Sequence, residues 1–451
     1  MSYVPHTDRD RAEMLAAIGV EQIEDLFHDV PAACRFPGLE LPQPLSEMEL
    51  MAELQAMSEE NMDVDHFPSF LGAGVYNHYV PSLVDQVISR SEFYTAYTPY
   101  QPEISQGTLQ SIFEYQSMVC ALTGMEVANA SHYDGATATA EAVTMALNVA
   151  RGRRKKVILS PSLHPEYRAV VRTYLQGMDL EIVGDDGGLE STLDDLAALL
   201  DNDTACLVVQ NPNFFGQIED LESLAREAHA VKAMFVVAAD PVSLGLLKPP
   251  GAYGADIVVG DGQGLGNGLN YGGPYLGYFA CRQKDVRKMA GRLVGQTVDA
   301  DGKRGFVLTL STREQHIRRE RATSNICTNQ ALNALAMAVH LAALGPQGLG
   351  TLARLCYHKA HYAAGRIGEL AGYKLVGAKP FFQEFVVRCP MPAQKLNDYL
   401  LAEWGIIGGY DLGRDYRGLE DHMMLCVTEV IGRDEIDALV EALAEAAEEV
   451  A

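Results

Sequence analysis

Hydrophobic and polar positions follow two different periods along the middle of the chain. Short apolar runs at 156–160, 205–210, 234–239 and 256–259 have the length and composition of buried strands. Between the second and the third run, residues 219–231 place apolar side chains at helical spacing. This order of strand, helix and strand predicts βαβ units and a mostly parallel sheet, which binds ligands at the carboxyl ends of its strands.

The segment before this sheet follows a helical pattern and then a loop pattern. Residues 7–30 have helical periodicity with Thr7 as the expected N-cap, and residues 40–60 carry Leu and Met at helical spacing. Residues 70–81, by contrast, combine glycines with aromatic side chains. We expect this stretch to be a loop that packs against a specific surface.

The pattern changes again after Asn329. A helical segment follows, residues 379–388 alternate like a strand, and residues 434–450 have the spacing of an amphipathic helix. We therefore expect an α/β protein of three parts, which are an N-terminal helical arm at 1–69, a large α/β domain at 70–330 and a smaller C-terminal α+β domain at 331–451.

Charge and cysteine usage narrow the classes of partner. The chain has 451 residues, with 60 acidic against 35 basic side chains and a net charge of −25. This sign disfavours nucleic acid and anionic membranes as partners, although it also simply keeps a protein soluble. The eight cysteines form no CxxC pair and no zinc spacing, so we expect no metal site and a reducing compartment. With no apolar leader at the N-terminus, we expect a cytoplasmic protein.

A glycine-rich loop follows the fourth predicted strand directly. Seven glycines lie between Gly260 and Gly273, which permits close approach of the backbone to another group. The G-x-G-x-x-G register of a dinucleotide-binding loop cannot be laid on them, no helix obviously follows, and the P-loop pattern is absent. Nicotinamide, flavin and nucleoside triphosphate binding are therefore disfavoured.

Asp240 follows an apolar strand about twenty residues before this loop. In sheet enzymes that use pyridoxal phosphate, such an aspartate pairs with the pyridine nitrogen and a lysine on a nearby loop forms the Schiff base. Here the loop has no lysine, and the nearest ones are Lys248 and Lys284. An aspartate at a strand end is also a common turn or cap residue, so both interpretations of Asp240 stay open.

Six stretches, spread over nearly the whole chain, carry a resemblance to a known family. They are residues 70–79, 97–110 and 124–142, the glycine-rich loop, and residues 311–320 and 322–330. In these stretches the chain resembles the P-protein of the glycine cleavage system, glycine dehydrogenase (decarboxylating), in its alpha-type (subunit 1) form. Arg321 stands where the pattern has a lysine, which keeps the charge.

The resemblance implies a fold type I, aspartate-aminotransferase-like structure and an α2β2 heterotetramer. It implies that the homologous beta chain alone carries the Schiff-base lysine. Laying the beta-type motif on Asp256 and Ile257 puts Gln263 and Gly264 where its His and Lys stand. Because glycine has no side chain to form an imine, the coenzyme is expected to be held covalently by the partner subunit and not by this chain.

The resemblance also suggests residues that complete a shared pocket for glycine. Candidates for the pocket are Tyr97, Tyr100, Gln101, Glu103 and Gln106, which precede a helix expected at 109–122. Candidates for holding an anion near a helix start are Thr323, Ser324, Asn325 and Thr328. The competing interpretations are a surface loop or structural interface turn for the first set and a plain N-cap for the second.

Further positions resemble a relic of the cofactor site itself. Gly135 and Thr137 resemble the phosphate-cup turn of fold type I enzymes, and Asp240, Gln263 and Gly264 complete the degenerate set. His132 and His164 are interpreted as ordinary polar residues.

The function implied is that of an enzyme subunit which, with its partner, decarboxylates glycine and transfers the aminomethyl group to the lipoyl arm of H-protein. One alternative is a structural or regulatory paralogue that only stabilises the beta chain. Another is a self-sufficient pyridoxal phosphate enzyme that uses an unexpected lysine such as Lys248.

Overall fold

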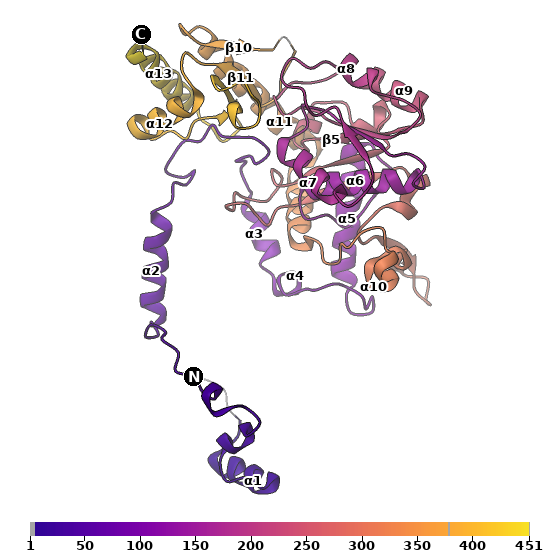
Figure 1. The fold of residues 1–451 in the computed structure, drawn as a ribbon, viewed down its shortest axis with the longest axis vertical. Coiled ribbons are helices and arrows are strands. Elements are labelled where there is room, and N and C mark those ends of the chain that lie inside the picture. Colours follow the sequence, from indigo (N-terminus) through magenta and orange to yellow (C-terminus); the bar gives the residue numbers. More distant parts are fainter. Residues whose placement is uncertain (1–4, 378, 451) are drawn as a thin grey trace. The chain divides into compact units, whose positions relative to one another are not determined.

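The computed structural model describes residues 5–377 and 379–450, and the chain forms two compact units, residues 1–62 and 63–451. Two expectations concern residues outside the described part of the chain. They are the absence of a leader, which begins at positions 1–4, and the end of the expected third domain at position 451. Figure 1 shows the elements of both units in chain order.

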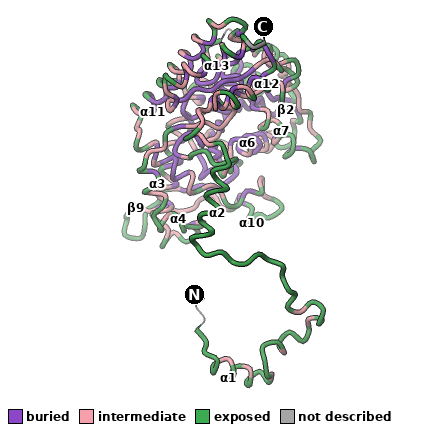
Figure 2. Tube along the Cα trace, turned by 90° about the vertical axis from the view of Figure 1, so that its left-hand side faces the viewer, coloured by how far each residue is buried: buried purple, intermediate pink, exposed green. Residues whose placement is uncertain are grey.

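The first unit contains short helices, and none of its residues from 5 to 62 is buried. Helix α1 (Asp8–Ile18) begins where predicted, because the Thr7 hydroxyl accepts a hydrogen bond from the Asp10 amide at 3.2 Å. The prediction that this helix reaches residue 30 is wrong, since Gly19 adopts a left-handed conformation with φ of 86° and ends it. Helix α2 (Glu47–Glu59) is capped by Ser46. Both helices lack buried residues along their described length, and Figure 2 draws them mostly as exposed.

The second unit is organised around a seven-stranded sheet with the strand order β1-β7-β6-β5-β4-β2-β3. Strands β2 to β6 run parallel, whereas β7 is antiparallel to both β6 and β1. The four predicted strands are therefore confirmed as neighbours in a mostly parallel sheet. The bounds are β1 Val127–Ala128, β2 Lys156–Leu159, β3 Glu181–Val183, β4 Thr204–Gln210, β5 Met234–Ala238, β6 Ile257–Asp261 and β7 Gly277–Cys281.

Helices cover both faces of this sheet, because its strands are apolar on both sides. On β5, Val236 packs with one core, together with α6 and α7, and Val237 packs with the other, together with α5, α9 and α11. Figure 1 shows α5, α6 and α7 around the strands. The helices of this region are α3 Ser82–Ile88, α4 Ser91–Tyr94, α5 Gln106–Thr123, α6 Gly135–Val149, α7 Pro165–Leu175, α8 Leu193–Ala198, α9 Glu222–Ala230 and α10 Gln315–Arg318.

A four-stranded antiparallel sheet of order β10-β11-β13-β12 forms a further core with the C-terminal helices, at one end of this unit in Figure 1. Helix α11 (Ala331–Gly368) contributes to both cores, through Met337 and Ile367 for example, and bends at Gly345. The division expected between 330 and 331 therefore falls at the start of a shared helix. The other bounds are β10 Lys374–Val376, β11 Glu384–Arg388, α12 Ala393–Trp404, β12 Tyr410–Asp411, β13 His422–Cys426 and α13 Arg433–Val450, with the separate hairpin β8 Val294–Val298 and β9 Arg304–Leu308.

The expected strand at 379–388 is only half correct. β11 begins at Glu384, whereas Phe381 forms an isolated bridge with Gln217 and the Phe382 amide donates to the carbonyl oxygen of Gly216. The first half of the segment thus pairs with the loop after β4 and not with the small sheet.

Helix α11 is the one described helix that is long and apolar enough, by length and composition, to cross a membrane. Both of its halves contribute buried side chains to the cores of the second unit. This packing accounts for its apolar character.

Candidate functional site

The carboxyl ends of β5 and β6 meet the N-terminus of α6, and most of the expected cofactor-site positions lie there. The amide of Gly135 donates a hydrogen bond of 2.9 Å to Oδ2 of Asp261, the last residue of β6. Gln263 and Gly264 follow in the loop, and Asp240 lies two residues beyond the end of β5. We call this group, with Gly135, the sheet-end site.

Two amides at the N-terminus of α6 are bonded to the chain's own carboxyl groups. Oδ1 of Asp134 accepts a hydrogen bond of 2.7 Å from the Thr137 amide, while Asp261 takes the amide of Gly135. A Cβ atom on Gly135 would lie 2.0 Å from the Tyr167 hydroxyl. An acidic side chain and a phenol therefore occupy the place where a phosphate would meet the helix N-terminus.

The side chains from the loop at 70–81 fill the rest of the sheet-end site. The Gln263 amide exchanges hydrogen bonds of 2.9 Å with the backbone N–H and C=O of Tyr76. A Cβ atom on Gly264 would lie 2.8 Å from the imidazole of His78, so this ring stands against the position of the missing lysine. The prediction that this loop packs against a specific surface is confirmed.

Carboxyl groups collect around the Tyr76 ring without a neutralising cation at hydrogen-bond distance among the residues the structure describes. Glu384 accepts from the Ala73 amide at 2.7 Å and from the Tyr76 hydroxyl at 2.9 Å. Burial raises the pKa of Glu384 and of Asp261 to about 7 each, and it also raises the pKa of Asp240. Asp240 itself accepts from the Val242 amide at 3.0 Å, as a turn residue does.

The two histidines interpreted as ordinary polar residues are both buried. Nε2 of His164 lies 2.8 Å from the Ala73 carbonyl oxygen, and its ring stacks on Tyr167 with centroids 4.9 Å apart. His132 lies 3.0 Å from the Asn129 side chain, and burial lowers its pKa to about 3. Each ring is thus engaged within the protein.

The sheet-end site of this chain does not fit pyridoxal phosphate. Its remaining cavity of about 30 Å³, between Tyr76, Tyr167 and Asp261, has the size for roughly one or two water molecules. The loop offers Gly264 in place of an amine, and the helix N-terminus already holds a carboxyl group. As it is folded, this site lacks room for the coenzyme ring, has a carboxyl group at the helix amide that a phosphate would use, and offers no amine at position 264.

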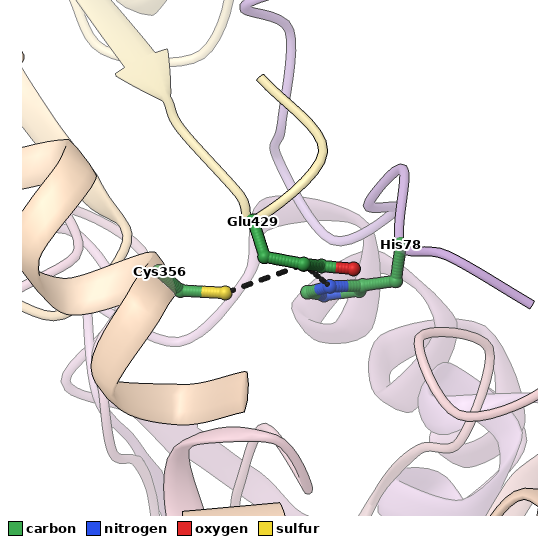
Figure 3. A group of neighbouring side chains, drawn as sticks. All are labelled: His78, Cys356 and Glu429. Carbon is green, nitrogen blue, oxygen red and sulfur yellow. Dashed lines mark hydrogen bonds and ion pairs between the residues drawn. The ribbon is translucent and has the colours of Figure 1, made fainter. Parts of the chain in front are cut away.

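His78, Cys356 and Glu429 form the one group of His, Cys, Asp and Glu side chains, within the described part of the chain, that lie close enough to share a metal ion. Figure 3 shows the three side chains converging. The Glu429 carboxylate accepts from Nδ1 of His78 at 2.7 Å and from the Cys356 thiol at 3.5 Å. Although burial acts to raise it, the bonds from His78 and the Tyr79 amide hold the pKa of Glu429 below its usual value. The group is a hydrogen-bonded network that ties the loop to the C-terminal region.

A second cavity, of about 210 Å³, opens between the segment after α4, helix α5 and the start of α11. It brings together two sets of residues expected from the sequence, because the Tyr97 hydroxyl lies 3.3 Å from Oγ1 of Thr328. Tyr97 is 75 % exposed at this cavity. We call it the Tyr97 cavity.

The other expected pocket residues take different places. The side chain of Gln101 and that of Glu103 are exposed, whereas Gln106 is fixed by hydrogen bonds of 2.9 Å with the backbone of Phe306 on β9. Tyr100 accepts a hydrogen bond of 3.1 Å from Arg292. Of the first set, Tyr97 alone lines the cavity as described.

The expected anion-holding residues are divided in the same way. α11 begins at Ala331, so Thr323, Ser324 and Asn325 lie too far upstream to cap it, and the N-cap interpretation is wrong. The Ser324 hydroxyl instead donates to the buried Glu141 carboxyl on α6. Thr328 lines the Tyr97 cavity.

Sequence reasoning missed Arg292. In the structure this residue is 3 % exposed and lines the Tyr97 cavity. A lone arginine before β8 carries no sequence motif, and its burial alone distinguishes it. Tyr76, Tyr167 and Asp261 were also missed. Asp261 carried a weak signal, since it directly ends an apolar strand next to a glycine-rich loop.

The lysines considered as alternative anchors lie at the surface. Nζ of Lys248 lies 3.3 Å from Glu222, and Nζ of Lys284 lies 3.6 Å from Asp256. Arg321 is paired with its neighbour Glu320 at 3.8 Å.

Relatives match nearly the whole length of the chain. Residues 1–443 match the family described as glycine cleavage system P-protein. A protein of Thermomicrobium roseum named probable glycine dehydrogenase (decarboxylating) subunit 1 is 56 % identical over 450 residues, which cover 99 % of this chain and 100 % of that protein. A protein of the same name from Geobacillus kaustophilus is 57 % identical over 444 residues, with 98 % of each covered.

Solved structures resemble the fold closely. A crystal structure described as glycine decarboxylase (P-protein) of the glycine cleavage system, in inhibitor-bound form, has a TM-score of 0.90 and 45 % identity, and covers 99 % of this chain and 100 % of its own. A glutamate decarboxylase of Lactobacillus brevis has a TM-score of 0.67 at 13 % identity, covering 93 % and 97 %, which shows the fold alone. The fold is that of the fold type I enzymes that use pyridoxal phosphate.

Proposed function

The chain belongs to the glycine cleavage system P-protein family, and from this premise we propose that it completes the active site of glycine decarboxylase without anchoring the coenzyme. It acts in glycine cleavage as one subunit of a heteromeric glycine dehydrogenase (decarboxylating). We propose that pyridoxal phosphate is held by a homologous, lysine-bearing partner chain in an α2β2 heterotetramer of the cytoplasm.

The filled sheet-end site is the observation that carries this proposal. Gly264 stands where an amine is needed, and the Asp261 carboxyl group takes the Gly135 amide that would meet a phosphate. These two features would deny the coenzyme both a covalent and an ionic hold in this chain. A chain so altered contributes to the reaction only through surfaces that it offers to a partner.

The Tyr97 cavity is the surface that we assign to this contribution. Tyr94 and Tyr97 line it and are 68 % and 75 % exposed. Large exposed aromatic and aliphatic side chains around a cavity are typical of a surface that a partner covers. Covering this rim would convert the open cavity into a pocket closed to water.

In this arrangement the chain binds and orients, while the coenzyme on the partner supplies the chemistry of decarboxylation. The hydroxyl groups of Tyr97 and Thr328 are donors for the carboxylate of glycine, and apolar walls such as Ile112 and Leu335 exclude water. A fixed carboxylate favours loss of CO₂ because the breaking bond must be held in one orientation. The aminomethyl group then passes to the lipoyl arm of H-protein, the second partner proposed.

Reconstitution with the lysine-bearing partner tests this role directly. We expect Tyr97→Ala to lower glycine-dependent CO₂ release about tenfold or more while the complex still assembles on size-exclusion chromatography. Tyr174→Ala, on α7 and away from the Tyr97 cavity, serves as the control and should keep full turnover. Unchanged turnover in Tyr97→Ala with normal assembly would instead support a purely structural subunit.

The isolated chain tests where the coenzyme is held. Incubated with pyridoxal phosphate, freed of unbound coenzyme and only then treated with borohydride, it should show no visible band of a lysine imine and no stoichiometric labelling of any one lysine. The partner treated in the same way should be labelled at its lysine. Labelling of this chain that disappears in Lys248→Ala would establish the self-sufficient enzyme instead.

A further inference from the structure

The Tyr97 cavity contains a buried positive charge without a negative partner. Arg292 is 3 % exposed and forms no ion pair within 4 Å among residues 5–377 and 379–450. Its Nη2 donates to the Tyr100 hydroxyl at 3.1 Å, Nη1 lies 3.5 Å from Oδ1 of Asn329, and its Nε–H has no acceptor. A guanidinium stays ionised at all relevant pH values, so burying it without an anion is unfavourable.

Another arginine of the same unit shows how such a charge can be balanced. Arg282 donates to the carbonyl oxygens of Ala255 and Gly251 at 3.0 and 2.6 Å, and it lies 3.8 Å from the Glu126 carboxylate. Arg292 has the Tyr100 hydroxyl, the Tyr100 ring with its centroid 5.5 Å from the guanidinium carbon, a distant amide oxygen and a thiol at 4.0 Å. Its Nε–H thus remains without an acceptor among the described residues.

The N-terminus of helix α11 points to the same cavity. Its N-cap, Gln330, makes no side-chain capping bond, and Ala331 and Leu332 of the first turn line the cavity. First-turn amides have no acceptor inside a helix and carry the positive end of its dipole. Uncapped amides and an unpaired guanidinium thus converge on one space.

The other described residues that line the cavity do not neutralise the positive charge of Arg292. Among the described residues that line the cavity there is no Asp or Glu, although the chain carries 60 acidic against 35 basic side chains. Hydroxyl donors from Tyr97 and Thr328 lie at its edge, at 3.3 Å from one another. The volume of about 210 Å³ accommodates a small ligand group.

We propose that the Tyr97 cavity is a binding site for a small oxyanion, with Arg292 as its fixed positive charge and the first turn of α11 as its amide donors. Guanidinium and helix amides together recognise carboxylate and phosphate oxygens alike. The anion is presented either by the amino acid substrate or by the phosphate of a coenzyme held by the partner. This assignment deepens the proposed function, on which its role in turnover rests, whereas binding itself is a property of this chain alone.

Anion binding is measured on the isolated, full-length chain by isothermal titration with inorganic phosphate and, separately, with glycine at constant ionic strength. We expect saturable binding of at least one of these two ligands. The affinity should fall about tenfold or more in Arg292→Met. It should fall less in Arg292→Lys, which keeps the positive charge but loses the planar guanidinium that can donate two parallel hydrogen bonds. Arg354→Met, a charge-matched change on α11 outside the cavity, should bind as the wild type does.

A measurement on the unmodified chain keeps the test independent of how the variants fold. Saturating phosphate or glycine should slow hydrogen exchange of the amides at 331–333 relative to an equal concentration of chloride. The proposal is overturned if neither anion binds and exchange at 331–333 stays unchanged, or if Arg292→Met binds as tightly as Arg354→Met.

The reconstituted complex then distinguishes the two sources of the anion. A raised KM for glycine in Arg292→Met, with normal retention of pyridoxal phosphate, assigns the site to the substrate carboxylate. Faster loss of the coenzyme with an unchanged KM assigns it to the phosphate. A complex that turns over normally in Tyr97→Ala would remove the proposed function and leave anion binding by the isolated chain standing.

Discussion

The sheet-end site and the Tyr97 cavity lie in the same unit and are opposite in almost every physical respect. At the sheet-end site, two carboxyl groups and two phenols line a cavity of only about 30 Å³, and two amides at the N-terminus of α6 are bonded to carboxyl groups of the chain. At the Tyr97 cavity, about 210 Å³ is lined by an unpaired guanidinium, and the N-terminus of α11 is uncapped. At the sheet-end site, hydrogen-bond donors are bonded to acceptors of the chain itself. At the Tyr97 cavity, donors remain available for a ligand.

This difference separates a site that maintains structure from one that meets a ligand. A helix N-terminus and a cation bind an external anion only if the chain supplies no internal one. Asp261 supplies it at α6, whereas no acidic side chain in the described part of the Tyr97 cavity does so at α11. Retaining an unpaired buried charge lowers stability, which is typical of positions where function outweighs packing.

The largest expected effect comes from forcing one more atom into the sheet-end site. Gly135→Ala should lower the free energy of unfolding by about 3 kcal/mol, because its Cβ would lie 2.0 Å from the Tyr167 hydroxyl and 3.0 Å from the Asp261 amide. Urea denaturation measures this. Gly107→Ala on α5, where a Cβ meets nothing within 4 Å, should stabilise the chain by about 0.5–1 kcal/mol. Equal effects at the two glycines would mean that the sheet-end site is not closed.

The next effect is a dependence of stability on pH. The pKa of Asp261 and that of Glu384 are raised by burial to about 7 in the folded chain, so both groups bind protons that the unfolded chain releases above its ordinary pKa near 4. Their contribution is fully present below that value and is lost as the pH rises through 7. Stability should therefore fall by about 2 kcal/mol per group between pH 5 and 8.

Urea denaturation across this range, with Glu384→Gln beside the wild type, measures the pH effect. Between pH 5 and 8 the stability of the variant should fall by about 2 kcal/mol less than that of the wild type, since one of the titrating carboxyl groups is gone. A variant with the same pH dependence as the wild type would show that Glu384 is ionised in the folded chain.

A smaller effect of opposite sign is expected at Arg292. In the ligand-free chain, Arg292→Met should raise the free energy of unfolding by about 1 kcal/mol, because an apolar side chain replaces an unpaired buried charge. Thermal and urea unfolding, with Arg354→Met as the control, measure it. A loss of stability would indicate that the bonds from Arg292 to Tyr100 and Asn329 outweigh the cost of its burial.

The smallest effect is expected at the rim of the open cavity. Tyr97→Phe removes one exposed hydroxyl contact of 3.3 Å and should change stability by less than about 0.5 kcal/mol. The same variant should lower turnover of the reconstituted complex. Joint measurement of unfolding and CO₂ release separates the two, and a stability loss that parallels the activity loss would contradict a role in the pocket.

The parallel sheet could be predicted from the sequence because its strands are buried on both faces. Apolar runs such as 205–210 and 234–239 then stand out from the helical segments beside them. The end of α1 was missed, although Gly19 is a common helix terminator, because apolar periodicity continues past it. The strand predicted at 379–388 was half wrong because Phe381 and Phe382 pair with the loop after β4. This long-range contact cannot be read from the local alternation of side chains.

The candidate site was less accessible to sequence reasoning. Tyr97 and Thr328 were identified through family motifs, yet their mutual contact spans 231 residues and follows only from the fold. Arg292 has no motif, and its importance lies in the absence of a partner, which no local pattern reports. Tyr76 and Tyr167 fill the sheet-end site through long-range packing that likewise leaves no local signature.

The Asp261 carboxyl group at the start of α6 has a consequence for how the two chains of such an enzyme depend on one another. Replacing Gly264 by lysine would still leave the His78 ring against the new side chain and an acid where the phosphate must lie. A lysine at position 264 would therefore not by itself create a coenzyme site in this chain. On the proposed function, no single substitution there frees this chain from its dependence on a lysine-bearing partner.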